Sequence, residues 1–260
     1  MIFRIKTYNF FLILVINTLI FGSSCSRDWS NPLDPGGNND AKIPTNGLVA
    51  YYPFNGNAND ESGNSYHGSV LGGATITNIL TIGDNNLDGV SLPFEVINGL
   101  ADFSISGWLK INIVHNSGPY YPGNSWITVS RNNEDNAFGL IYENYQNAWK
   151  FVINDIRNDH FKSDTTMNDH GWHHIVVTRN GFTARMYIDS EENGNGIQVS
   201  NTLLNVDKYG VIIGQEQDNL GGGFEQHQSW AGEMDNIRIY NRSLTEEEIQ
   251  ALYHEGDWGN

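Results

Sequence analysis

The sequence predicts an all-β fold whose strands have the length and spacing of a sandwich, followed by one short helix. Short runs of alternating apolar residues recur from residue 47 onward, at about the 8–12-residue spacing of sandwich strands. Turn-forming residues separate these runs, and the chain contains 28 glycines. Hydrophobic residues make up 39% of the 260 residues, which supports a real core in one β-rich domain.

The individual strands are predicted from period-two alternation. Near the start of the domain, Leu48, Ala50 and Tyr52 alternate with other residues. In the run FSISGWLKI, residues 103–111, one face is apolar and the other carries serines, a tryptophan and a lysine. A hairpin is expected across the Asn180-Gly181 pair, which is a turn signal. Further strands are predicted at residues 126–130, 138–142, 150–154, 172–180, 183–189, 211–214 and 234–240.

One helix is predicted in LTEEEIQALYHEG, residues 244–256. Thr245 is expected as the N-cap with Glu248 three residues later, which is a capping box, and Gly256 can close the C-terminal end. The helix is expected to lie on the sandwich and to bury one apolar stripe, formed by Ile249, Leu252 and Tyr253.

The first 45 residues have the pattern of a processing signal and a linker. Arg4 and Lys6 precede an apolar segment, residues 10–21, which is shorter than the roughly 20 residues that span a bilayer. Residues 1–24 are therefore interpreted as a signal peptide. Residues 25–45 are rich in Pro, Gly, Asn and Asp, and are expected to form a tether to a domain at residues 46–260.

Cys25 is the only cysteine in the chain and lies where a cleavage site is expected. The segment resembles a bacterial lipoprotein signal peptide, which implies lipidation of Cys25 after cleavage. Gly22 departs from the usual lipobox, but the relaxed lipobox of Bacteroidetes-type bacteria tolerates it. This predicts a membrane-anchored lipoprotein at the outer membrane, on the cell surface or the periplasmic face. An ordinary secretory peptide with an incidental cysteine is the alternative.

The charge of the chain excludes some partners. There are 30 acidic against 14 basic residues, a formal net charge of −16. Such a surface repels phosphate backbones, so nucleic acid is not an expected partner. The charge suits neutral ligands and cations, although solubility alone can also explain it.

Four motifs together resemble a known family. They are GLVAYYPFNGNANDESGNSYHG at residues 47–68, FSISGWLK, GWHHIVVTRNG with MYID, and GEMDNIRIYNRSLTEEEIQALY at residues 232–253. In this order they resemble the laminin-G-like or concanavalin A-like jelly-roll domain of bacterial surface proteins. The resemblance implies a two-sheet antiparallel jelly roll from about residue 46 to 258. It also implies a carbohydrate- or protein-binding module, often with one structural Ca²⁺.

The loop at residues 55–64 is the predicted calcium site. Ca²⁺ takes six to eight oxygen ligands, and this loop offers carboxylate, amide and main-chain oxygens. Asp60 is the expected anchor and Asn57 a further ligand. Asp235 is the candidate remote carboxylate, because the family's first and last motifs pair when the jelly roll closes. The alternative is that these residues only form turns, with Asp60 capping the backbone.

Two catalytic or metal alternatives were weighed against binding. Glu233 and Asp235 resemble the first two positions of the Glu-x-Asp-x-x-Glu motif of jelly-roll glycosidases, but Arg238 occupies the third acidic position. A retaining mechanism then lacks its general acid, so the protein is not expected to be an enzyme. His173 and His174 are adjacent on a strand and therefore face opposite sides, which does not favour a zinc site.

Loop aromatics interspersed with amides favour sugar binding, because aromatic faces cover the apolar face of a pyranose and amides bind its hydroxyls. Tyr121, Tyr145 and Trp149 are the predicted platform. The function predicted is a non-catalytic, extracytoplasmic module that binds a glycan or glycoprotein. A protein–protein adhesion or assembly module and a degenerate jelly-roll glycoside hydrolase are the alternatives.

Overall fold

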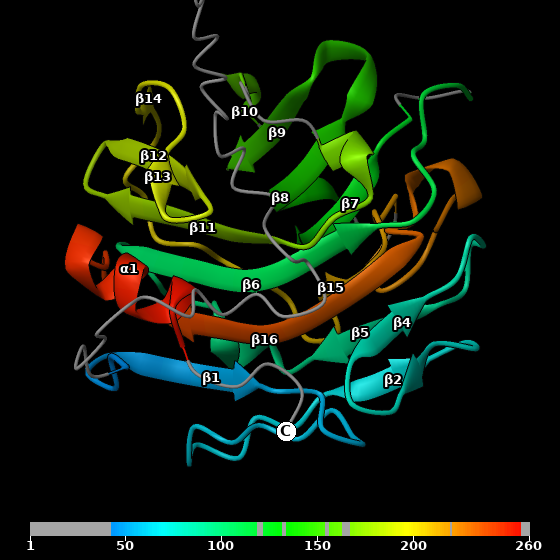
Figure 1. Cartoon of the computed structure of the whole chain (residues 1–260), viewed down its shortest axis with the longest axis horizontal. Helices are drawn as coiled ribbons and strands as arrows, with labels where there is room; N and C mark the ends of the chain where they lie inside the picture. The colour runs from blue at the N-terminus through cyan, green and yellow to red at the C-terminus, as the bar shows by residue number, and fades with distance from the viewer. Residues whose placement is uncertain are drawn as a thin grey trace, which may run out of the picture.

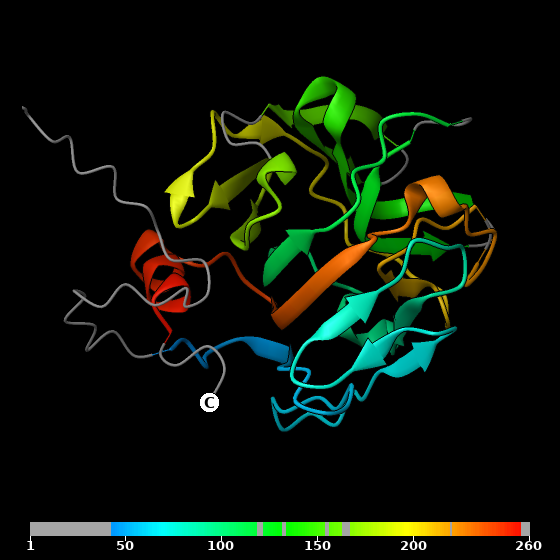
Figure 2. The same cartoon turned by 45° about the vertical axis from the view of Figure 1, so that its right-hand side comes forward.

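The computed structural model describes residues 43–118, 122–131, 134–153, 156–162, 167–218 and 220–255. Over these ranges the chain forms two antiparallel β-sheets and one short α-helix near the C-terminal end (Figures 1 and 2). The prediction of an all-β, two-sheet sandwich with a C-terminal helix is therefore confirmed. No helix within these ranges is long and apolar enough to cross a membrane.

The nine-stranded sheet has the order β13-β12-β11-β6-β16-β4-β3, with β1 paired to β16 and β14 paired to β12. Its strands are β1 (Leu48–Tyr52), β3 (Thr75–Ile76), β4 (Leu80–Ile82), β6 (Phe103–Ile111), β11 (His173–Asn180), β12 (Thr183–Ile188), β13 (Glu191–Glu192), β14 (Ile197–Gln198) and β16 (Gly232–Tyr240).

The seven-stranded sheet has the order β10-β9-β8-β7-β15-β5-β2. Its strands are β2 (Ser69–Leu71), β5 (Gly89–Leu92), β7 (Asn124–Arg131), β8 (Glu134–Glu143), β9 (Ala148–Ile153), β10 (Ile156–Lys162) and β15 (Val211–Ile213). Short 3-10 turns interrupt the loops at η1 (Phe94–Val96), η2 (Asn144–Gln146), η3 (Met167–Asp169) and η4 (Gln226–Gln228).

The helix α1 (Glu246–Tyr253) begins at the capping box that the sequence predicts. The Glu248 backbone N–H donates to Thr245 Oγ1 at 3.3 Å, and the Thr245 N–H donates to Glu248 Oε2 at 3.0 Å. These two bonds satisfy two backbone donors that the first helical turn leaves free. The predicted cap at Gly256 lies outside the described residues.

The hairpin β11–β12 differs from the prediction by one residue in its turn. Asn180 pairs with Thr183, so the two central residues are Gly181 and Phe182 rather than Asn180 and Gly181. Gly181 has a φ of +58°, which a glycine adopts without steric penalty. Glycine at the first central position is the pattern of a type II′ turn, whose twist matches that of the strands.

The first and last motifs of the domain lie side by side, as expected. Strand β1 pairs antiparallel with β16, and Tyr51 stands opposite Arg238 (Figure 1). Arg238 stacks 3.8 Å from the centre of the Tyr51 ring, and its Nη2 donates to Glu255 Oε1 at 2.6 Å. This contact links the start of the domain to the end of α1 without a disulfide.

The core between the sheets is built from the inward residues of each strand. In β6, Phe103, Ile105 and Leu109 are buried in it, as the period-two alternation requires. Aromatic rings fill much of the volume on the side of the seven-stranded sheet. Trp149 lies 6.2 Å from Trp126 and 6.2 Å from Trp230, measured between ring centres.

The outer face of the nine-stranded sheet is partly covered by α1. Ile249 and Leu252 pack on Val176, Tyr187 and Tyr240, so the predicted apolar stripe is buried as expected. At the other end of the helix, Tyr253 packs on Trp108 and Trp172. His174 is buried in this layer, 5.2 Å from the Trp108 ring centre. Burial in this apolar setting lowers the pKa of His174 to about 3.

We predict that His174 makes the fold acid-sensitive. Its imidazole stays neutral in the folded protein but takes up a proton in the unfolded chain below about pH 6.5. The free energy of unfolding should therefore fall from about pH 6.5 toward pH 3, by up to about 1.4 kcal/mol per pH unit for this one proton. In His174→Leu this slope should become shallower, as measured by urea unfolding at several pH values. The same dependence of the unfolding free energy on pH in His174→Leu and the wild type would contradict the prediction. His170→Gln is the control and should keep the wild-type slope.

Candidate functional site

The oxygen-rich loop at residues 55–64 is organised around the Asp60 carboxylate. Its Oδ1 accepts hydrogen bonds from the Tyr51 and Ser62 N–H groups, each at 2.9 Å. Its Oδ2 accepts from Ser62 Oγ at 2.9 Å and from the Tyr66 N–H at 3.0 Å. Although burial alone would raise the pKa of Asp60, these backbone donors lower it below its ordinary value. The Asp60 side chain thus caps the backbone of the loop, as expected if these residues form turns.

The other two predicted calcium ligands are also engaged by the protein. Asn57 Oδ1 accepts the Asn59 N–H at 2.7 Å, which is an Asx turn. Asp235 is buried in β16, where burial raises the pKa of its carboxyl to about 8. Within the described ranges, no group of three or more His, Cys, Asp or Glu side chains could hold a metal ion. The oxygens of Asn57 and Asp60 thus already accept backbone N–H groups, and a calcium site at Asn57, Asp60 and Asp235 stays a prediction.

The predicted aromatic platform is not assembled. Trp149 is wrong as a ligand residue, because it is fully buried in β9 between Tyr142 and two other tryptophans. Trp149, Phe151 and Ile153 alternate in β9 and all face the core. Trp126 and Trp230, which also lie in loop-like sequence, are fully buried as well. Tyr121 lies outside the described residues.

Tyr145 remains as a surface aromatic, with 52% of its area exposed. It lies in the turn η2 between β8 and β9, and its hydroxyl donates to Glu143 Oε2 at 3.0 Å. Gln146 Nε2 donates to the same oxygen at 2.6 Å. An aromatic ring beside amide groups is suited to a sugar, but in the described residues Trp149 does not join Tyr145 at the surface.

The carboxylates of the glycosidase-like motif are not arranged for catalysis. Glu233 forms an ion pair with Lys110 at 3.0 Å. Asp235 is buried, and Arg238 bonds to Glu255. The pairing of β16 with β6 shifts between Asp235 and Arg238, where Asn236 has a φ of +49°. This bulge follows Glu233 and Asp235, which stay in regular register with β6, and it comes before Arg238, the third position of the motif.

The adjacent histidines face opposite ways, as expected, but both are buried. His173 Nδ1 lies 2.9 Å from Asp189 Oδ2, and its Nε2 lies 3.2 Å from each carboxylate oxygen of Asp169. Although burial alone would lower the pKa of His173, these carboxylates raise it. Opposite facing would leave one of the two exposed on a sheet with an open outer face, but Asp169 in η3 and Asp189 in the β12–β13 turn contact His173, and it is buried.

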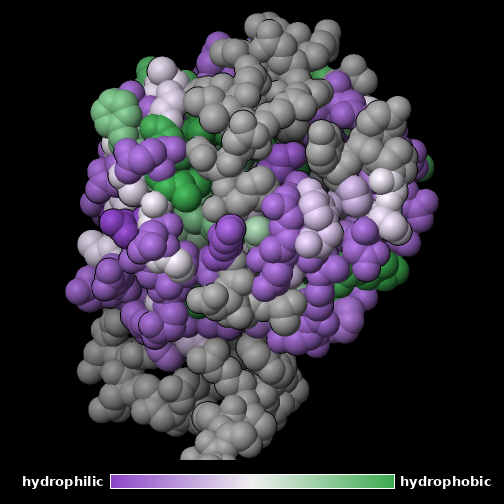
Figure 3. Space-filling model, turned by 90° about the horizontal axis from the view of Figure 1, so that it is seen from above, coloured by the Kyte–Doolittle hydropathy of each residue, from purple (hydrophilic) through white to green (hydrophobic). Residues whose placement is uncertain are grey.

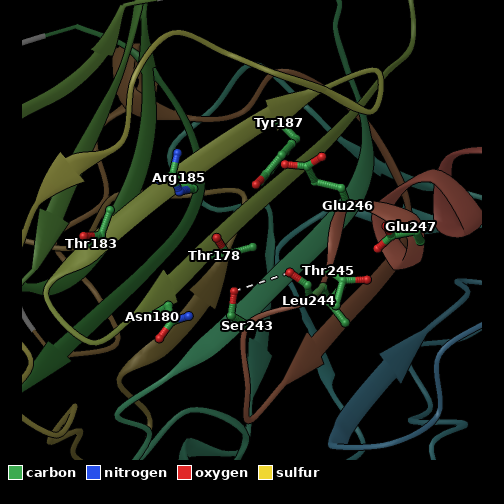
Figure 4. A pocket seen from close by; sticks show the side chains of 10 residues that line it. All are labelled: Thr178, Asn180, Thr183, Arg185, Tyr187, Ser243, Leu244, Thr245, Glu246 and Glu247. Atoms are coloured by element: carbon green, nitrogen blue, oxygen red, sulfur yellow. Dashed lines mark hydrogen bonds between the residues drawn. The ribbon is translucent and has the colours of Figure 1, made fainter.

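A polar groove of about 450 Å³ lies between the β11–β12 hairpin and the start of α1 (Figure 4). We call it the hairpin groove. One side is formed by the residues Thr178, Asn180, Thr183, Arg185 and Tyr187, and the other by residues 243–247. The volume is in the range of small-ligand sites, about 300–1,000 Å³.

The strand register places the hairpin residues on one face. Thr178 stands opposite Arg185, and Asn180 opposite Thr183. Residues two apart on a strand point to the same side, so these four side chains form one polar patch on the outer face of the sheet. Tyr187 is two residues beyond Arg185 and continues the row toward α1, where Figure 4 shows it facing Glu246.

The charges around the hairpin groove are mostly acidic. Arg185 Nη1 donates to Glu192 Oε1, which neutralises the guanidinium. Glu246 and Glu247 are exposed at the start of α1. Ser243 Oγ donates weakly to the Leu244 carbonyl at 3.4 Å (Figure 4). The groove therefore presents hydroxyl and amide groups under a net negative rim, on a surface whose upper face is mostly hydrophilic (Figure 3).

The hairpin groove could not be identified from the sequence. A signal was present, because Thr178, Asn180, Thr183 and Arg185 are the outward positions of the predicted hairpin and all are polar. On a half-buried sheet such a face is usually only solvated. The pattern predicts the helix, but it does not show that the start of the helix lies beside this hairpin and makes the face a groove.

The fold and site define a lectin- or glucanase-type β-sandwich. Residues 84–250 match the family described as the concanavalin A-like lectin/glucanases superfamily, and the chain belongs to this family. Among curated proteins, neuronal pentraxin-1 of Rattus norvegicus is 32% identical over 154 residues, 58% of this chain and 33% of that protein. Serum amyloid P-component of Mesocricetus auratus is 45% identical over 58 residues, 22% of this chain and 24% of that protein. The chain thus spans about a third or less of the length of these relatives.

Solved structures share the fold at low sequence identity. Domain 4 of a GH43 extracellular arabinanase from Geobacillus stearothermophilus, in complex with arabinotriose, has a TM-score of 0.61 at 16% identity. That match covers 79% of this chain and 98% of the domain. A Trypanosoma rangeli sialidase in complex with sialic acid has a TM-score of 0.59 at 19% identity, covering 82% of this chain and 33% of the sialidase.

We predict that the Asp60 carboxylate stabilises the fold without a metal. Asp60→Ala removes the acceptor of four hydrogen bonds and should lower the free energy of unfolding by about 2–4 kcal/mol. The loss should be the same in EDTA and in Ca²⁺, as measured by thermal unfolding. Because the pKa of Asp60 is lowered in the fold, its contribution is present above about pH 4 and is lost as the pH falls below that value. A wild-type melting temperature that rises with Ca²⁺, while that of Asp60→Ala does not, would show instead that Asp60 is a calcium ligand.

Proposed function

We propose that this protein is a non-catalytic binding module that recognises carbohydrate, either free or on a glycoprotein. The observation that carries the proposal is the hairpin groove, a polar hollow of about 450 Å³ on a fold of the lectin/glucanase superfamily. Its hydroxyl, amide and carboxylate groups are the kinds that bind sugar hydroxyls. The arabinanase domain adds support, because a domain of nearly the same extent is known in complex with arabinotriose.

The absence of turnover is supported by the placement of the carboxylates. Glycosidases use two carboxyl groups that flank the scissile bond, one of them with a raised pKa. Asp235 has the raised pKa but is buried in β16, and Glu233 is paired with Lys110. Glu246 and Glu247 lie at the hairpin groove, but the pKa of Glu247 is lowered by its own backbone N–H and by Thr245. A lowered pKa does not suit Glu247 to act as a general acid.

The proposed location is the extracytoplasmic side of a membrane, through lipid on Cys25. The proposal rests on the short apolar segment at residues 10–21, the small residues before Cys25, and the Pro- and Gly-rich stretch after it. A double lipid chain would anchor the protein stably, whereas one chain would bind reversibly. The leader and all but the last three residues of the tether lie outside the described residues.

The function is tested on a glycan array with the full-length protein in detergent. We expect binding to at least one glycan class, and no release of reducing ends from the polysaccharide that carries it. A silent array at millimolar glycan would contradict the proposal, and a captured protein partner would then support the adhesion alternative. Release of reducing ends at a rate above the buffer control would restore the hydrolase alternative.

A further inference from the structure

We propose that the hairpin groove is the saccharide-binding site and that it selects neutral over anionic glycans. This inference rests on the proposed carbohydrate-binding function and adds its location and its selectivity. The comparisons with known proteins assign no role to this surface. Three features of the groove support the inference: fixed polar groups without protein partners, no open aromatic face, and an acidic rim.

The polar groups of the hairpin are held in place and available. Thr178 and Tyr187 are 3% and 6% exposed, and both stand on paired strands, so their rotamers are restricted. In the part of the chain that the structure describes, the side chains of Thr178, Asn180 and Tyr187 have no hydrogen-bond partner. A hydroxyl, an amide and a phenol thus converge on one hollow. Restricted and unoccupied polar groups bind a ligand at a low entropic cost.

The groove contains no open aromatic face. The ring of Tyr187 is buried against α1 in the cluster with Val176 and Ile249, so only its hydroxyl end is available to a ligand. A sugar in the hairpin groove would therefore be held by hydrogen bonds to its hydroxyls and not by ring stacking. This distinguishes the groove from the exposed ring of Tyr145, where stacking would dominate.

The charges at the rim determine which sugars can enter. Arg185 is neutralised by Glu192, which leaves Glu246 and Glu247 as the uncompensated charges of the groove. A carboxylate or sulfate on a glycan would lie near these two groups and be repelled, at a cost that falls as salt screens it. A neutral glycan experiences no such repulsion. Specificity here comes from excluding the wrong ligand as much as from binding the right one.

The experiment compares hydroxyl-removing variants at two surfaces. The full-length protein is titrated calorimetrically with neutral and anionic probes. The neutral probes are arabinotriose and the strongest neutral glycan from the array, and the anionic probe is 3′-sialyllactose. In Thr178→Val/Tyr187→Phe, neutral-probe affinity should fall at least tenfold. In Tyr145→Phe, which removes one hydroxyl at the other surface, and in Tyr145→Ala, which also removes the exposed ring, it should change less than twofold. Thermal unfolding checks that each variant is folded. Asn180 is exposed, so Asn180→Ala should fold normally and should lower the affinity for the neutral probes severalfold even if the double variant is unstable.

The rim is tested separately. In Glu246→Gln/Glu247→Gln, binding of 3′-sialyllactose should strengthen severalfold at low salt, while neutral-probe affinity should change less than twofold. Unchanged neutral binding in both hairpin variants, the double variant and Asn180→Ala, would overturn the location while the proposed function stood. Loss of binding in Tyr145→Ala alone would overturn it as well. An array positive only for anionic glycans would overturn the selectivity. A silent array would overturn the function itself, so the failures are distinguishable.

Discussion

The arrangement of this protein depends on a short helix that covers only part of a sheet. Eight residues of α1 extend about 12 Å. The strands β12, β11, β6, β16 and β1 on which it can lie are roughly 19 Å across. The helix is fixed at one end by the Thr245 capping box and at the other by Tyr253 on Trp108. The part of the sheet under the helix forms a second buried layer that includes His174. The part beside the start of the helix stays open and forms the hairpin groove.

Much of the fold was predictable because its strands are long and alternate regularly. The run at 103–111 is a strand over the predicted residues, and the capping box at Thr245 needs no tertiary information. Strands β2 to β5 were not predicted, since each has only two to four residues and no measurable period. The turn at Gly181-Phe182 was placed one residue early, because Asn-Gly is the commoner signal for a different turn type.

The site was less predictable, because it depends on what each side chain meets in space. Loop-like sequence around Trp149 suggested exposure, but the alternation with Phe151 and Ile153 is a core pattern. Asp60 and Asn57 have the composition of a calcium loop, yet the oxygens of both accept backbone N–H donors. Composition identifies groups able to bind a ligand, and only the geometry shows which of them the protein already uses.

The central claim is that a neutral glycan binds between the β11–β12 hairpin and the start of α1. The most direct measurement is a nuclear magnetic resonance titration of isotope-labelled protein with arabinotriose and with the strongest neutral glycan from the array. The account predicts amide shifts concentrated in residues 178–187 and 243–247, which form the two sides of the groove. Shifts confined to residues 143–147 around Tyr145, or no shifts at millimolar glycan, would contradict it.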